Sequence, residues 1–235
     1  MEKTKKIEIL FPEFCNLFGD LSNMSYLKKC MPNEEFIETQ LNEEPAFVKQ
    51  DVNMIYMGPM TEKAQEKVIK KLMPYKDRII ELIENNVVFL VTGNAVEIFG
   101  KYIENEDGTK IEALGIFDIY SKRNMLNRHS SIFVGKYEDI ELVGFKSQFT
   151  FCYGDNSNNY FSEVEKGIGL NPESKLEGIK KNNFIGTYVI GPLLILNPQF
   201  TKKLLTKIGI TEPKIAFEED VEKAYEQRLK ELKAL

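Results

Sequence analysis

The chain of 235 residues contains few of the side chains on which common catalytic and metal sites depend. It has a single histidine and only three cysteines. Cys15, Cys30 and Cys152 show no CxxC spacing, and their odd number argues against a disulfide framework or a zinc site. We therefore expect reduced thiols, no bound metal and no cofactor.

Long apolar runs and an excess of basic residues are also missing. No apolar run approaches the ~18 to 20 residues of a transmembrane helix, and the first residues lack the apolar core of a signal peptide. The formal net charge is −5, and lysine is mixed with glutamate along the chain, so no basic stripe is available for nucleic acid. We predict one cytoplasmic domain spanning residues 1–235, with no membrane span and no nucleic-acid partner.

The first hundred residues alternate between two periodicities. Short apolar runs at 6–11, 52–57 and 87–92 and an alternating run at 35–41 are typical of strands. The stretches 16–31 and 61–84 have the apolar spacing of helices, the second opened by Thr61 as an N-cap and interrupted near Pro74. This alternation predicts an α/β fold with a doubly wound, mostly parallel sheet.

Beyond Gly100 the pattern indicates antiparallel strands. The Glu-Asp-Gly sequence within 101–111 predicts a hairpin, and 131–153 is expected to hold two or three strands. Further along, the pattern predicts an apolar strand over 184–194, a helix over 197–208 and a charged amphipathic helix over 218–235. No internal repeat or low-complexity linker interrupts the chain.

The segment 87–100, VVFLVTGNAVEIFG, has the outline of a nucleophile elbow, in which an apolar strand turns sharply into a helix. It resembles the strand, Cys-Gly-Gly-Tyr-Gln, helix pattern of the class I glutamine amidotransferases. In an ungapped comparison the cysteine of that family falls on Gly93, the glycines on Asn94 and Ala95, and the glutamine on Glu97. Glycine cannot supply the attacking thiolate.

Four further motifs resemble the same family in the same order. They are FPEFCNLFGDLSNM at 11–24, LGIFD at 114–118, Val-Gly-Phe at 143–145 and IGTYVIGPLL at 185–194. They are similar to the glutaminase subunit that works with a Mur-ligase-like partner to amidate the peptidoglycan precursor, and next to the cobyric acid synthase glutaminase domains. The resemblance implies a three-layer α/β/α sandwich of flavodoxin-like type with added antiparallel strands.

The departures from the family pattern cluster at the positions that carry its chemistry. By this resemblance, the general base histidine is replaced by Ile190, which cannot take or give a proton. The loop expected to supply an oxyanion donor is Gly58-Pro59-Met60, and Pro59 has no N–H. The histidine of the family's Asn-His pair is replaced by Gln148 or its neighbour Ser147. The pattern predicts that glutamine hydrolysis has been lost.

The resemblance also suggests a ligand site. Arg128 occupies the place where the cell-wall glutaminases carry an arginine that holds the glutamine carboxylate, a task that suits the guanidinium fork. Asn94, Glu97 and Gly58 are the other expected ligand contacts, for glutamine or another small amino acid. The alternative for Arg128 is a solvated loop arginine, one of several basic residues in 122–128.

Two functional hypotheses remain open. The first is a non-catalytic binding or scaffolding subunit docked on a Mur-ligase-like or other synthetase partner through the face formed by residues 14–24. The second is an active amidotransferase or hydrolase that uses displaced residues, which would require Cys15 or Cys152 close to His129. We expect His129 to be an ordinary surface or strand-edge residue and both cysteines to be packing residues.

Overall fold

A six-stranded sheet forms the centre of the molecule. In the computed structural model, which describes residues 3–235, its strand order is β13-β14-β4-β3-β1-β2. β2, β1, β3, β4 and β14 are parallel, and β13 joins antiparallel at one edge. The strands are β1 (Lys6–Leu10), β2 (Glu35–Thr39), β3 (Met54–Met57), β4 (Val88–Thr92), β13 (Ile179–Lys181) and β14 (Phe184–Thr187). The predicted doubly wound α/β fold is confirmed.

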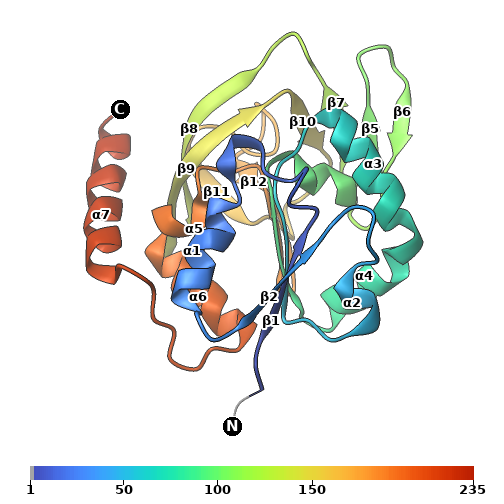
Figure 1. Cartoon of the computed structure of the whole chain (residues 1–235). Coiled ribbons are helices and arrows are strands. Elements are labelled where there is room, and N and C mark those ends of the chain that lie inside the picture. Colours follow the sequence, from blue (N-terminus) through green and yellow to red (C-terminus); the bar gives the residue numbers. More distant parts are fainter. Residues whose placement is uncertain (1–2) are drawn as a thin grey trace.

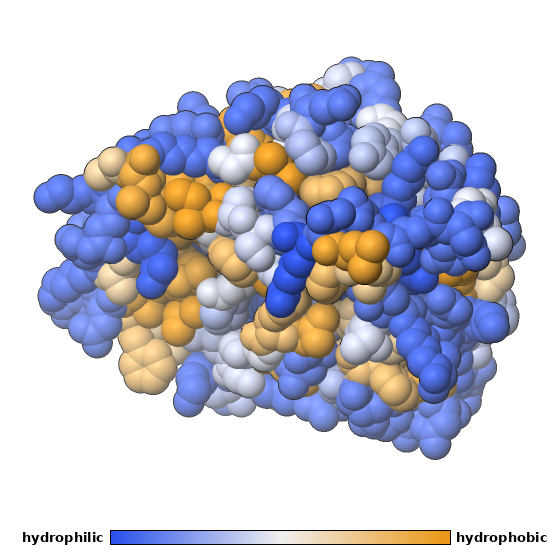
Figure 2. Space-filling model, turned by 90° about the horizontal axis from the view of Figure 1, so that it is seen from above, coloured by the Kyte–Doolittle hydropathy of each residue, from blue (hydrophilic) through white to orange (hydrophobic). Residues whose placement is uncertain are grey.

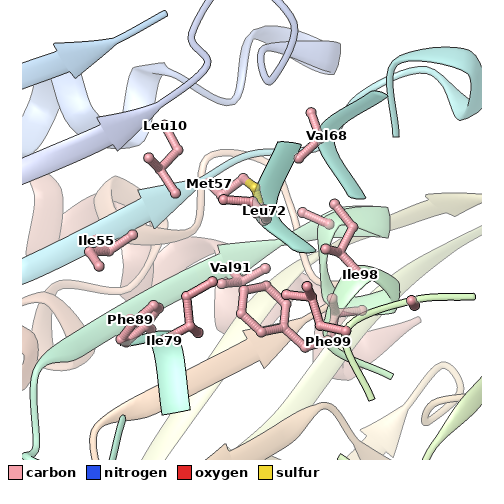
Figure 3. Close-up of a cluster of buried hydrophobic side chains, with 14 of the residues drawn as sticks. Leu10, Ile55, Met57, Val68, Leu72, Ile79, Phe89, Val91, Ile98 and Phe99 are labelled. Atoms are coloured by element: carbon pink, nitrogen blue, oxygen red, sulfur yellow. The ribbon is translucent and has the colours of Figure 1, made fainter. Parts of the chain in front are cut away.

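Helices cover both faces of this sheet and make it the middle of three layers (Figure 1). On one face lie α2 (Ala46–Lys49), α3 (Glu62–Leu72) and α4 (Lys76–Glu84), whose apolar side chains pack on β3 and β4 (Figure 3). On the other lie α1 (Ser22–Cys30), α5 (Leu193–Leu196) and α6 (Pro198–Ile208). All residues of β3 and β4 are buried, because both faces of a doubly wound sheet are covered.

Two boundary signals of the sequence behave as expected. The Thr61 side chain accepts a hydrogen bond from the Ala64 N–H and caps α3. Pro74 lies in the short 3-10 helix η2 (Met73–Tyr75), which separates α3 from α4. α6 begins at a proline and ends at Gly209 in the left-handed conformation, and α7 (Glu218–Ala234) forms the predicted charged helix.

The region after Gly100 supplies two four-stranded sheets. The first has the order β10-β7-β5-β6 and the second β12-β11-β8-β9. The predicted hairpin at Glu-Asp-Gly is confirmed, since β5 and β6 pair antiparallel around it. The strands of the first sheet are β5 (Tyr102–Glu104), β6 (Lys110–Glu112), β7 (Tyr120–Arg123) and β10 (Thr150–Tyr153). Those of the second are β8 (His129–Tyr137), β9 (Ile140–Gln148), β11 (Ser162–Lys166) and β12 (Leu176–Glu177).

Two predicted elements are shorter than their sequence pattern. The helix expected over 16–31 is divided into a 3-10 turn η1 (Leu17–Gly19) and α1, because Phe18 and Gly19 have φ of 61° and 70°. The strand expected over 184–194 ends at Thr187. Gly191, with φ of 122°, and Pro192 then turn the chain into α5. An apolar run alone does not distinguish a buried strand from a buried turn and helix.

In the described residues 3–235, no helix is long and apolar enough to cross a lipid bilayer.

Candidate functional site

The chain turns sharply at Gly93, directly after the central strand β4. Gly93 has a φ of 59° and opens the 3-10 helix η3 (Gly93–Phe99). This left-handed conformation between a buried strand and a helix is the strained turn of a nucleophile elbow, and glycine adopts it without steric cost. The predicted strand-to-helix turn at Gly93 is confirmed.

Pro59 closes the space in which a side chain at position 93 would lie. A Cβ atom built on Gly93 would be 2.5 Å from the Pro59 Cβ and 3.3 Å from its Cγ. Non-bonded carbon atoms approach to about 3.5–4.0 Å. The loop after β3 and the elbow after β4 therefore fit together only because residue 93 has no side chain.

The polar groups of the same loop are already paired. The Met60 N–H donates to Asn94 Oδ1 at 3.0 Å, and Asn94 Nδ2 donates to the Met60 carbonyl at 2.8 Å. The Pro59 carbonyl accepts from the Leu17 N–H at 2.9 Å. Pro59 has no N–H, and the next amide along the loop is held by Asn94. Neither Pro59 nor Met60 therefore presents a free backbone N–H to a ligand.

A pocket of about 380 Å³ opens beside the elbow, at the carboxyl end of the parallel strands. Figure 2 looks down on this end of the molecule and shows hydrophobic patches among hydrophilic residues. The elbow side of the pocket is formed by Gly93, Asn94 and Pro59. The rest of the lining comes from Leu17, Phe18, Thr61, Glu62, Arg128, Ser147, Gln148, Phe149 and Thr150. Its volume falls within the range of small-molecule sites.

Arg128 lines this pocket and is exposed to solvent. Its Nε donates to Ser147 Oγ at 2.7 Å, and the guanidinium carbon lies 5.3 Å from the Phe18 ring centroid and 5.7 Å from that of Phe149. Two cation–π contacts and one hydrogen bond favour this position of the guanidinium group. The structure thus brings Arg128 and Asn94 to the same pocket as Gly93.

The other expected ligand contacts lie elsewhere. Glu97 is fully buried, where its Oε1 accepts from the Tyr188 hydroxyl at 2.8 Å and its Oε2 from Gln65 Nε2 at 2.9 Å. Burial raises the pKa of Glu97 to about 7. Glu97 does not line the pocket, so its expected contact with a ligand is wrong. The reason is that η3 turns its side chain toward α3 rather than toward the opening.

Gly58 is required by packing and is not part of the pocket lining. A Cβ atom there would lie 2.5 Å from the Cys15 carbonyl oxygen and 2.9 Å from the Tyr56 hydroxyl. Only glycine allows the chain to pass so close to these two groups.

Ile190 lies at the same edge of the sheet as Gly93 but does not face it across the pocket. β14 pairs with β4, and Thr187 is the partner of Thr92, so both chains leave the sheet side by side. Ile190 then exchanges two backbone hydrogen bonds with Phe145, at 2.9 and 3.1 Å, and is almost fully buried. It is not part of the pocket lining. The family resemblance predicts that Gly93 and Ile190 lie at one edge of the sheet and face each other across a shallow pocket. The two positions do lie at one edge, but Ile190 is outside the pocket, so the second part of this prediction is wrong.

A sequence model of the CobB/CobQ-like glutamine amidotransferase domain matches residues 6–197. This range includes the elbow, the residues that line the pocket and the carboxyl end of β14. The chain belongs to this family. Two relatives are named lipid II isoglutaminyl synthase (glutamine-hydrolyzing) subunit GatD. The protein from Staphylococcus aureus is 28% identical over 194 residues, covering 82% of this chain and 79% of that one. The protein from Streptococcus pneumoniae is 24% identical over 207 residues, covering 84% and 77%.

Solved structures agree with this assignment at the level of the fold. A glutamine amidotransferase crystal structure superimposes with a TM-score of 0.55 at 12% identity, covering 86% of this chain and 99% of that one. A glutamine amidotransferase from Thermotoga maritima gives 0.52 at 11% identity, covering 96% and 94%. The predicted amidotransferase fold is therefore confirmed.

Within this amidotransferase domain, neither Cys15 nor Cys152 is placed as a nucleophile beside a base. Cys15 and Cys152 are fully buried. Burial raises the pKa of both thiols, that of Cys152 to about 12. The Cys152 Sγ lies 3.0 Å from Ser121 Oγ and 3.2 Å from the Tyr188 hydroxyl. His129 Nε2 instead contacts Ser131 Oγ at 3.0 Å, and burial lowers the pKa of its ring. Both thiols are protonated at neutral pH, and thiols are poor nucleophiles.

Asp20 is buried and accepts hydrogen bonds from the hydroxyls of Tyr56 and Thr92, so it ties the η1 turn to the ends of β3 and β4. Burial raises the pKa of Asp20. Within residues 3–235, no group of three or more His, Cys, Asp or Glu side chains could hold a metal ion.

The sequence pattern missed Phe18, Phe149 and Asp20 as parts of the site. The two rings that enclose Arg128 come from segments far apart in the chain; Phe18 lies in the opening motif at 11–24, and Phe149 lies in none of the motifs. Asp20 lies within the Gly-Asp pair of the opening motif, which was the one available signal.

Proposed function

We propose that this chain is a non-hydrolysing glutamine amidotransferase-like protein that acts as a binding or scaffolding subunit of a Mur-ligase-like or other synthetase partner. The contact between Pro59 and Gly93 is the main support. Glycine at the turn provides no nucleophile, and the proline ring occupies the space that a cysteine Cβ would need. A nucleophile could return here only if the neighbouring loop changed too.

The groups around the elbow support the same proposal. A glutaminase requires a base near its nucleophile and N–H donors for the oxyanion. Position 190 holds a buried isoleucine, Pro59 has no N–H, and the Met60 N–H is bonded to Asn94. Each of these differences alone would lower the rate of glutamine hydrolysis, and all of them meet at one edge of the sheet.

The names of the two GatD relatives support the proposal of a synthetase partner. Both are named as subunits of a lipid II isoglutaminyl synthase, so we propose that this chain also joins a synthetase that modifies a peptidoglycan precursor. The contact surface is the η1 turn, where the exposed fractions are 37% for Leu17 and 50% for Phe18. Met24, at the end of the face expected from the sequence, is buried in the core and is excluded from this surface.

The pocket gives this subunit a ligand site. Arg128 lines the pocket and its guanidinium can hold a carboxylate, and we propose that glutamine or another small amino acid binds there without being hydrolysed. We also propose a cytoplasmic location, which agrees with the three unpaired cysteines.

The alternative, an active amidotransferase or hydrolase with displaced residues, has less support. It requires a thiolate within reach of a base, whereas Cys15 and Cys152 are buried thiols with raised pKa values. His129 has its own partner in Ser131.

Ammonia release tests the loss of hydrolysis. The purified chain, alone and with the co-expressed synthetase, is incubated with glutamine, and ammonia is measured through glutamate dehydrogenase. We expect no release above background, because the members of a catalytic dyad act as a unit. GatD from Staphylococcus aureus is the positive control. Turnover that disappears on Cys15→Ser or Cys152→Ser would overturn the proposal in favour of a displaced nucleophile.

A further inference from the structure

The outer edge of strand β6 is open to a further strand. β6 ends the sheet β10-β7-β5-β6, and it lies at the side of the molecule opposite α7 (Figure 1). The Asn105 N–H donates to the Thr109 carbonyl at 2.8 Å, and the Ala113 N–H donates to the Lys101 carbonyl at 3.0 Å. These two bonds fix which residue pairs of the β5–β6 ladder are hydrogen-bonded.

The backbone groups of Lys110 and Glu112 face away from β5. Hydrogen-bonded and non-bonded pairs alternate along an antiparallel ladder. Ile103 is the partner of Ile111, so this pair is bonded, and the pairs that contain Lys110 and Glu112 are the non-bonded ones between. The N–H and carbonyl groups of these two residues therefore point to the open edge. Their separation of two residues is the spacing at which an added antiparallel strand forms its bonds.

The inner face of β6 borders an apolar groove. Ile111 lies on the same face as its partner Ile103, which is fully buried. Ile111 also lines a groove of about 600 Å³ together with Ile69 of α3 and with Met73 and Pro74 of η2. Met73 is one of the large apolar residues exposed on the surface. A strand added to β6 would place its own apolar side chain over this groove.

The outer face of β6 carries two opposite charges. Lys110 Nζ lies 4.2 Å from the Tyr102 ring centroid and 3.9 Å from Glu104 Oε2. Glu112 is exposed, and in the described part of the chain its carboxylate forms no hydrogen bond or ion pair. The edge therefore has the sequence Lys-Ile-Glu, with a positive and a negative charge on either side of an apolar residue.

We propose that a second copy of this chain pairs antiparallel with the β6 edge about a two-fold axis at Ile111. The two four-stranded sheets then form one continuous sheet. Lys110 of each copy lies opposite Glu112 of the other, and these are the residues whose backbone groups are free to bond. Ile111 of each copy lies over the groove of the other. A two-fold interface requires a self-complementary surface, and this edge has one in backbone, charge and shape.

The same features select this register over its neighbours. An axis at Lys110 or at Glu112 would place like charges directly opposite each other, which is destabilising. An axis between two residues would bring the free groups of Lys110 against those of Ile111, which are already bonded to β5. A lysine on an edge strand normally discourages pairing. In the register centred on Ile111, each lysine instead meets a glutamate.

This surface is separate from the elbow pocket. The groove meets α3 at Glu66, Ile69 and Lys70, whereas the elbow pocket meets its start at Thr61 and Glu62. The proposal therefore goes beyond the proposed function and does not depend on it. A synthetase on the η1 turn and a second copy on β6 can be bound at the same time, which gives an assembly with two copies of each protein.

Sedimentation velocity of the purified chain tests the association. At about 100 µM we expect a species of twice the 27.1 kDa of one chain, which dissociates on dilution. A mass of one chain at this concentration would overturn the proposal, even if the β6 edge then proved to bind the synthetase. A dimer that is lost on Phe18→Ala would also overturn it, because that residue belongs to the η1 turn.

Charge reversal tests the register. Lys110→Glu and Glu112→Lys each place like charges opposite each other in both cross-strand pairs, so each should raise the dissociation constant of the dimer by at least about tenfold. The double variant exchanges the two charges and should restore the natural value. Lys230→Glu and Glu226→Lys make the same changes on the exposed face of α7 and should have no effect. Circular dichroism establishes that each variant is folded.

Mixing the two single variants gives the sharpest result. One then presents two acidic positions and the other two basic positions along the same edge, so a one-to-one mixture should form a heterodimer at least as tight as the natural dimer. A dimer that tolerates both single reversals, a double variant that stays monomeric, or a mixture that does not associate would each overturn the pairing about Ile111.

Discussion

Replacing Gly93 with alanine should destabilise the protein much more than the same change at another left-handed glycine. A left-handed φ costs a non-glycine residue ~1–2 kcal/mol. The new methyl group would also lie 2.5 Å from the Pro59 Cβ, and overpacking of this kind costs ~1–3 kcal/mol. We therefore expect Gly93→Ala to lower the free energy of unfolding by ~2–5 kcal/mol.

Gly108 provides the matched control. Its φ is 82°, and a Cβ atom built on it meets no heavy atom within 4 Å, so Gly108→Ala carries the backbone strain without the clash. We expect Gly108→Ala to cost only ~1–2 kcal/mol. Urea unfolding followed by circular dichroism measures both, with an unchanged denaturant slope as the sign that only stability differs.

A double-mutant cycle isolates the contact itself. Pro59→Gly removes the two proline atoms nearest to the new methyl group and leaves Cα at 3.4 Å, an ordinary contact distance. Gly93→Ala should therefore cost ~1–3 kcal/mol less in the Pro59→Gly background than in the natural one. The reasoning is refuted if Gly93→Ala costs no more than Gly108→Ala, or if the cost does not depend on residue 59.

Three further predictions concern activity, pH and the partner. Gly93→Cys combined with Ile190→His should give no strong glutaminase activity in the ammonia assay, since a missing oxyanion donor alone costs ~10²- to 10³-fold; turnover close to that of GatD would contradict this. Burial raises the pKa of Glu97 to about 7, so its contribution favours folding at low pH and is lost as the pH rises from about 4.5 to 7. Glu97→Gln should remove this pH dependence, so the change in unfolding free energy between pH 5 and 8 should be smaller in the variant than in the natural protein by on the order of 2–4 kcal/mol. Urea titrations at several pH values measure this difference. The same pH dependence in both proteins would refute the raised pKa of Glu97. Phe18→Ala should weaken a co-purified synthetase complex and change the melting temperature little, because the ring is half exposed; an unchanged complex, or a large loss of stability, would remove Phe18 from the interface.

The sequence determined the elements that depend on neighbouring residues. The apolar run before Gly93 and the tolerance of Gly-Asn for positive φ predict a strand that turns sharply at this point. Thr61 and Pro74 set the start and the interruption of the helical region by local capping and by the loss of an N–H. These effects operate within a few residues, so their consequences can be predicted from the chain alone.

The tertiary structure decided how these elements combine into a site. The sequence placed Glu97 beside a ligand, but the direction of η3 turns it toward Gln65 and Tyr188 in the core. The fit of Pro59 against Gly93 depends on two loops that meet only after folding. Local pattern specifies which residues form a strand or a helix. Which side chain faces the pocket is set by close packing between segments distant in the sequence, and no period in the sequence records it.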